Sequence, residues 1–108
     1  MKPDHPAIAN TLSALATLYQ EQKKYEMAES LYKQALDIGE RAYPSGHPNI
    51  ASIQNNLAYL YQITGKKDQA EALYLRALKI VEQQLEPDHP YIVRTRNGLK
   101  ALRESIQD

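Results

Sequence analysis

The chain has 108 residues, in which thirteen lysines and arginines balance thirteen aspartates and glutamates, and it has no cysteine. A net charge of zero argues against nucleic acids and anionic membrane surfaces as partners, because both need basic patches. The missing cysteines exclude disulfides and thiolate metal sites, and no apolar run approaches the roughly 20 residues of a membrane span. Without a signal peptide pattern either, we expect a cytoplasmic chain.

A long period organises the sequence. The dipeptide His-Pro occurs three times, at residues 5–6, 47–48 and 89–90. Both intervals are 42 residues, and segments 5–46 and 47–88 carry the same residue at 18 of 42 aligned positions. Because a fixed period of roughly 20–50 residues is typical of stacked repeats, we expect a single domain, 1–108, with two full repeats and a shorter third unit, 89–108.

Each full repeat is predicted to form two helices, the first of which begins at His-Pro. Proline suits the first helical position, where its missing N–H leaves no intrahelical bond unmade, and apolar residues then recur at helical spacing. Gly65 is a favourable residue just beyond a helix end. The predicted helices span residues 6–22, 25–42, 48–64, 67–84 and 90–106. Their short connections favour antiparallel neighbours.

Alanine and tyrosine recur where the helices are expected to touch. The recurring alanines are Ala16, Ala28, Ala58 and Ala70. Small side chains let helix axes approach to the close end of the ~8–10 Å range. We expect Tyr32 and Tyr74 to fill the wider part of each joint, so that all six residues belong to the core.

The recurring residues resemble a known signature. The first helices read Leu-Ala-x-x-Tyr at Leu15–Tyr19 and Leu57–Tyr61, and the second helices read Ala-x-x-x-Tyr-x-x-Ala from Ala28 and Ala70. This pattern resembles the tetratricopeptide repeat, and its 42-residue length is similar to the long form found in kinesin light chains. The resemblance implies an all-α, right-handed solenoid of antiparallel helix pairs, which binds peptides or partner helices in a concave groove.

The third unit, residues 89–108, differs where a second helix would pack. Lys100 stands where the full repeats have an alanine, and Arg103 stands where they have a tyrosine. Cations at these positions keep an outer face soluble, as the terminal repeats of solenoids require. We therefore expect a capping helix at 89–108, which gives five helices in all.

The first predicted helix carries no equivalent lid. Its apolar face, with Ile8 and Leu12, is expected to receive a preceding repeat or to support weak self-association. The chain is therefore expected to be a monomer or a weak homo-oligomer. Two origins stay open at this point, a fragment of a longer array and a small engineered repeat protein.

No combination of residues predicts catalysis. His5, His47 and His89 lie one repeat apart, so that two interhelix spacings, about 20 Å in total, would separate successive rings. Because a histidine nitrogen must lie about 2.1 Å from a zinc ion to bind it, the three rings could not share one ion. The Gly-Lys at 65–66 lacks the glycine-rich loop that precedes a phosphate-binding lysine. We therefore expect no enzyme activity, no metal and no cofactor.

The face of the first helices that packing does not need carries the candidate binding residues. They are Ser13, Ser52, Asn55, Asn56, Tyr59, Arg94 and Asn97. Side-chain amides both donate and accept hydrogen bonds, tyrosine offers a flat apolar contact, and arginine pairs with carboxylates. Asn55 and Asn56 also match groove asparagines of the long-type family that the sequence resembles.

The sequence thus predicts a non-catalytic scaffold that holds a protein or peptide partner in its groove. Two alternatives stay open. The candidate residues can form a merely solvated helix face, and the chain can be a structural module that associates with itself through its first helix.

Overall fold

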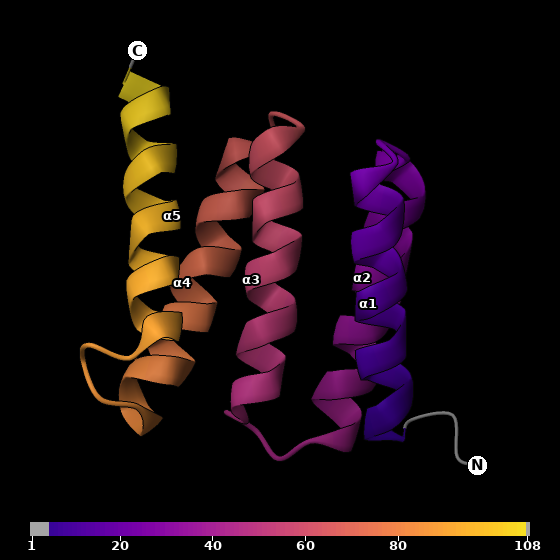
Figure 1. The fold of residues 1–108 in the computed structure, drawn as a ribbon. Helices are drawn as coiled ribbons and strands as arrows, with labels where there is room; N and C mark the ends of the chain where they lie inside the picture. The colour runs from indigo at the N-terminus through magenta and orange to yellow at the C-terminus, as the bar shows by residue number, and fades with distance from the viewer. Residues whose placement is uncertain (1–4, 108) are drawn as a thin grey trace.

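The computed structural model describes residues 5–107, with side chains through residue 104. Within that range the chain forms five α-helices and no strand (Figure 1). The helices are α1 (Pro6–Glu21), α2 (Tyr25–Ala42), α3 (Pro48–Ile63), α4 (Lys67–Gln84) and α5 (Pro90–Gln107). Each helix begins and ends within one residue of its predicted bounds. The expected all-α class is confirmed.

The three His-Pro dipeptides begin α1, α3 and α5, as predicted. In each dipeptide, the histidine Nδ1 accepts a hydrogen bond from the backbone N–H two residues later. The distances are 3.1 Å at His5, 3.0 Å at His47 and 3.1 Å at His89. Each bond satisfies an N–H group that the start of a helix leaves without an intrahelical partner. The repeated His-Pro therefore marks helix starts.

The ends of α1 and α3 share one backbone conformation but not one residue. Lys23 and Gly65 occupy the same repeat position just beyond the helix, with φ angles of 63° and 85°. After α1, the N–H of Lys24 donates to the carbonyl of Tyr19 at 2.9 Å, and Lys66 donates to Tyr61 at 2.8 Å after α3. These bonds close a Schellman motif, whose left-handed residue favours glycine.

The helices stack as antiparallel pairs. α1 packs on α2 and α3 packs on α4, while α2 and α4 also pack on the first helix of the next unit. The largest buried cluster contains Ala16, Ala28, Tyr32, Leu57, Ala58, Leu60, Tyr61, Ala70, Leu73, Tyr74, Leu99 and Leu102. All five helices contribute to this cluster, so the core runs through the stack. The predicted burial of the recurring alanines and of Tyr32 and Tyr74 is confirmed.

The first helices of the two repeats differ in burial despite their shared sequence. Leu57 and Leu60 of α3 are 3% and 1% exposed, whereas Leu15 and Leu18 of α1 are 38% and 54% exposed. The reason is that α2 covers this side of α3, and no described helix covers the same side of α1. Leucines that the two repeats share in sequence therefore do not share the same degree of burial.

Candidate peptide-binding face

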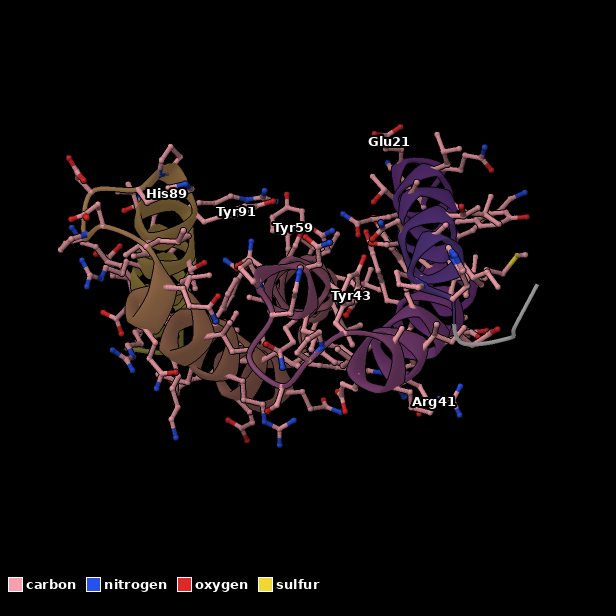
Figure 2. All side chains as sticks on the ribbon, turned by 90° about the horizontal axis from the view of Figure 1, so that it is seen from below. Glu21, Arg41, Tyr43, Tyr59, His89 and Tyr91 are labelled. Carbon is pink, nitrogen blue, oxygen red and sulfur yellow. The ribbon has the colours of Figure 1, made fainter. Side chains whose placement is uncertain are left out.

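The first helices of all three units lie on one side of the molecule. Figure 2 looks roughly along the helices, so that the stack runs across the view, and shows α1, α3 and α5 on this side, with α2 and α4 on the other. Tyr59 projects from α3 into the open space between α1 and α5 (Figure 2) and is 48% exposed. This arrangement places the predicted candidate residues on a shared surface.

A first hollow lies between α1 and α3 and has a volume of about 260 Å³. It is lined by Asn10, Ser13, Ala14, Thr17, Asn49, Ser52, Ile53 and Asn56. We call it the α1–α3 hollow. It brings together three of the predicted residues, and the amide of Asn56 donates to the hydroxyl of Ser13 across it at 3.4 Å. Its lining offers amide and hydroxyl groups and carries no charge.

Tyr43, in the connection between α2 and α3, supports the α1–α3 hollow at one end. Its hydroxyl accepts the amide N–H groups of Asn49 at 2.9 Å and Asn10 at 3.3 Å. Its ring stacks on His47, with 4.3 Å between the ring centroids. The connection thereby joins the N-terminal parts of α1 and α3. Asn49 was not predicted to line a binding surface. The feature of the sequence that could have indicated it is Tyr43, the tyrosine between the two repeats.

A second hollow lies between α3 and α5 and has a volume of about 340 Å³. It is lined by Asn55, Tyr59, Gln62, Tyr74, Arg94, Asn97, Gly98 and Ala101. We call it the α3–α5 hollow, and it collects the other four predicted residues. The guanidinium of Arg94 donates to the amide oxygen of Asn56 at 3.5 Å. Because Asn56 lines the first hollow, this contact joins the two.

Asn55 differs from the free side chain that the sequence suggested. It is 4% exposed, and its amide oxygen accepts the hydroxyl of Thr95 at 3.2 Å. Thr95 is itself buried in α5. Asn55 therefore ties α3 to α5 as well as lining the hollow. Replacing it would disturb the helix joint, which makes Asn56 and Asn97 the cleaner tests of binding.

Two buried tyrosines stand behind the face as neutral hydrogen-bonding groups. Burial raises the pKa of Tyr74 to about 12 and also raises the pKa of Tyr32. The Tyr74 hydroxyl donates to Gln62 at 2.8 Å, and the Tyr32 hydroxyl lies 2.8 Å from the Thr17 hydroxyl. The hydroxyl groups of both tyrosines therefore stay protonated at neutral pH. Tyr74 was expected only as core, and its place beside the hollow was missed.

Gly98 lets α5 approach Tyr74 closely enough to form the second hollow. A Cβ atom added at Gly98 would lie 2.8 Å from Cζ of Tyr74, closer than such atoms normally come. The Tyr74 ring cannot swing away cheaply, because it is 3% exposed and its hydroxyl is bound to Gln62. The signal for this contact in the sequence was a glycine inside a predicted helix.

Charge is nearly absent from the two hollows. The sequence of α3 contains no aspartate, glutamate, lysine or arginine, and the only charged residue of α1 is Glu21 at its end. Arg94 is the one charged side chain among the residues that line the two hollows. A ligand here would meet hydrogen-bonding groups, one exposed aromatic ring and a single positive charge.

The described part of the chain holds neither a metal-binding cluster nor a membrane-spanning helix. Among residues 5–107, no three His, Asp or Glu side chains gather in a way that could hold a metal ion. No described helix combines the length and the apolar character that crossing a membrane requires.

Two family models described as tetratricopeptide repeat match the chain, one over residues 8–49 and the other over residues 49–108. Two crystal structures of nearly identical TPR-like repeats, from a Podosopora anserina protein described as a putative kinesin light chain, each superpose on 99% of this chain. Their TM-scores are 0.80 and 0.78, at 22% and 24% sequence identity. This chain spans only about half of each, 50% and 51%.

A shorter likeness connects the chain to curated proteins. Nephrocystin-3 of Xenopus laevis, Xenopus tropicalis and Homo sapiens is 51% identical to it over 35 residues. The matched segment is 32% of this chain and 3% of each relative. The likeness is therefore confined to about one repeat.

Proposed function

The chain belongs to the tetratricopeptide repeat family, whose repeats generally act as protein-interaction modules, and on this premise we propose a non-catalytic scaffold. Its ligand is a peptide segment or partner helix that lies across α1, α3 and α5. The observation that carries the proposal is the pair of adjoining hollows on this face, which meet at Asn56 and Arg94.

The lining of the hollows supports a peptide ligand. Side-chain amides offer both a donor and an acceptor, so Asn56 and Asn97 can bond to the N–H and C=O groups of a backbone of any sequence. Tyr59 offers an exposed ring against which an apolar ligand side chain can lie. These groups suit a chain with few charges rather than a polyanion.

Arg94 gives the face a chemical preference. It is exposed on α5 at the boundary of the two hollows, where no acidic side chain lines either one. A carboxylate of the ligand, either an acidic side chain or the terminal carboxyl group, can therefore pair with it through charge-assisted hydrogen bonds. We assign to Arg94 a selectivity for such ligands that weakens as salt is added.

The proposed domain organisation is two repeats, 5–46 and 47–88, with residues 89–108 as a polar end to the stack. Lys100 is exposed, and Arg103 is also mostly exposed while it pairs with Glu71 of α4 at 3.4 Å. The exposed Lys100 keeps its part of α5 hydrated, as a capping helix requires, whereas Arg103 is directed to the preceding helix α4.

Titration of a peptide selected from a random library against single variants tests the proposed site. Asn56→Ala and Asn97→Ala should each weaken binding by about 0.5–1.5 kcal/mol, the usual worth of one hydrogen bond. Arg94→Ala should weaken peptides that carry a carboxylate more than their amidated counterparts. Lys79→Ala, an exposed change on α4, serves as the control and should leave binding unchanged.

The opposite result would contradict the proposed site. If Lys79→Ala weakens the peptide while the three variants on the first helices bind it normally, the ligand lies on the side of α2 and α4. Urea unfolding of each variant, followed by circular dichroism, separates lost binding from lost stability.

A further inference from the structure

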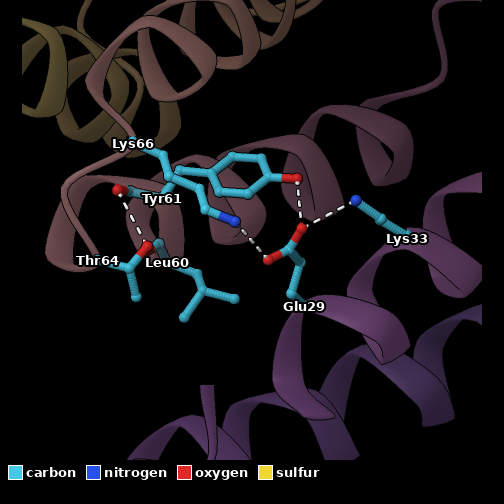
Figure 3. A network of polar contacts seen from close by, with 6 residues as sticks. All are labelled: Glu29, Lys33, Leu60, Tyr61, Thr64 and Lys66. Atoms are coloured by element: carbon cyan, nitrogen blue, oxygen red, sulfur yellow. Dashed lines mark hydrogen bonds and ion pairs between the residues drawn. The ribbon is translucent and has the colours of Figure 1, made fainter. Parts of the chain in front are cut away.

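A carboxylate joins the two full repeats. Figure 3 shows Glu29 of α2 between side chains of its own helix and of the next repeat. Its carboxylate accepts the Tyr61 hydroxyl at 3.2 Å and lies 3.1 Å from the ammonium of Lys66. It also pairs with Lys33 at 2.8 Å. The Lys66 ammonium lies 5.5 Å from the centre of the Tyr61 ring, so cation and ring together form the receiving site.

The same contact recurs one repeat later with a different donor. Glu71 of α4 stands 42 residues after Glu29, and it pairs with Arg103 of α5 at 3.4 Å. Arg103 stands 42 residues after Tyr61. The second helix of each repeat therefore presents a glutamate, at a fixed register, to the first helix of the following unit.

The first repeat carries the same receiving site. Tyr19 and Lys24 stand 42 residues before Tyr61 and Lys66. The ammonium of Lys24 lies 5.7 Å from the centre of the Tyr19 ring, which is the arrangement found in the second repeat. Within residues 5–107, the structure gives neither the Lys24 ammonium nor the Tyr19 hydroxyl a carboxylate partner.

The apolar surface beside this receiving site is also uncovered. Leu15 and Leu18 are 38% and 54% exposed, and Met27 at the start of α2 is 47% exposed. Met27 also lines a hollow of about 530 Å³ together with Lys23, Lys24, Tyr25 and Glu26. In the second repeat α2 covers the matching leucines. The surface therefore has both the apolar and the charged features that α3 offers to α2.

We propose that this outward surface of α1 is a docking site for an amphipathic helix that carries a glutamate within an Ala-Glu-x-Leu-Tyr sequence. This is the chemistry that α2 and α4 present to the helices that follow them. In the docked state the glutamate lies between Tyr19 and Lys24, and the apolar side of the helix covers Leu15 and Leu18. The surface is separate from the two hollows of the proposed peptide site.

A second copy of this chain does not supply that helix. The glutamates of α2 and α4 are already bound, to Tyr61 and Lys66 and to Arg103, and both helices already pack against α3 and α5. The partner is therefore the second helix of another repeat of this type, contributed by a different stretch of polypeptide.

An extended chain tests the proposal. A second copy of residues 24–42 is placed ahead of Met1 of the full chain. Residues 1–4 then connect the copy to His5, which equals the four residues, 43–46, that connect α2 to α3. The matched control is the same extension with Gln in place of the copied glutamate.

Two measurements report docking. The extension should raise the urea midpoint of the whole chain. In a Leu18→Cys background, which holds the chain's only thiol, it should also slow maleimide labelling roughly tenfold, because a docked helix must open before the thiol reacts. Glutamine in the copy and Lys24→Ala in the chain should each reduce the gain, by up to about fivefold in the unfolding equilibrium constant.

The two changes should also be non-additive, because they remove the same contact. The proposal is overturned if the extension changes neither the midpoint nor the labelling rate, or if the losses from the two changes simply add. It is also overturned if light scattering shows the parent chain to be a dimer in which labelling at position 18 is already slow, because a second copy would then occupy the surface.

Discussion

The helices α1 and α3 read almost the same pattern of leucine, alanine and tyrosine, yet only α3 is enclosed. Leu60 is 1% exposed and its counterpart Leu18 is 54% exposed. Both leucines are on helices with the same start, the same alanine contact and the same end. The difference between them comes from the neighbouring helix, which shows that in a stack burial belongs to the interface rather than to the residue.

The largest expected effect tests this comparison directly. Leu60→Ala should cost about 2–5 kcal/mol in the free energy of unfolding, because it leaves a cavity inside the stack. Leu18→Ala should stay within about 0.5 kcal/mol, as is usual for exposed positions. Urea unfolding of the two variants measures both. Equal losses would mean that the outward side of α1 is covered in solution.

The joint between α4 and α5 gives the next effect in size. Gly98→Ala should lower stability by about 1–2 kcal/mol, because overpacking against the Tyr74 ring outweighs the gain in helix propensity. Ala14 occupies the same repeat position on α1, where it lines the α1–α3 hollow and is exposed. Ala14→Gly therefore measures propensity alone. A stabilising Gly98→Ala would show that the Tyr74 ring yields freely.

The helix ends compare the repeats at a single backbone position. Lys23→Gly should stabilise the chain by about 1 kcal/mol and Gly65→Ala should destabilise it by a similar amount, because left-handed backbone strains any residue with a Cβ. Thermal unfolding of both variants measures the pair. Changes of the same sign would contradict the shared Schellman geometry.

Local features of the sequence were sufficient to predict most of the fold. The His-Pro starts, the buried alanines and the bounds of the helices depend on residues within one turn or one repeat. The burial of Asn55 was not predicted, because it depends on Thr95, 40 residues away in another unit. The exposure of Leu18 was not predicted for a related reason, since a pattern cannot say which neighbour is present.

The candidate site was predictable to a similar depth. Helical spacing was sufficient to place all seven candidate residues around the two hollows, because that spacing fixes which side of a helix a residue faces. Two residues that line the hollows could not be predicted from the sequence. Tyr74 reaches the second hollow only because Gly98 admits it, and Asn49 is held by Tyr43 across a connection. Both depend on side-chain contacts between elements.

The smallest expected effect compares the two glutamate contacts. Glu29 has two partners on the next repeat, Tyr61 and Lys66, whereas Glu71 has a long contact to Arg103. Glu29→Gln should cost up to about 1 kcal/mol at neutral pH, and Glu71→Gln should cost less, because exposed pairs contribute little. A loss at Glu71 that equals or exceeds the loss at Glu29 would contradict this ranking.

Lowering the pH should remove the folding stability that the Glu29 carboxylate contributes. The hydrogen bond from Lys33, with a further contribution from Lys66, lowers the pKa of Glu29 below its ordinary value of 4.5, although burial partly opposes the shift. A carboxylate with a lowered pKa stabilises the folded chain above its unfolded pKa, and that stability is lost as the pH falls through the folded value. The gap in unfolding free energy between the parent chain and Glu29→Gln should therefore close between about pH 5 and about pH 3. A gap that stays constant over this range, in urea titrations at matched ionic strength, would show that the Glu29 carboxylate does not hold the two repeats together through its charge.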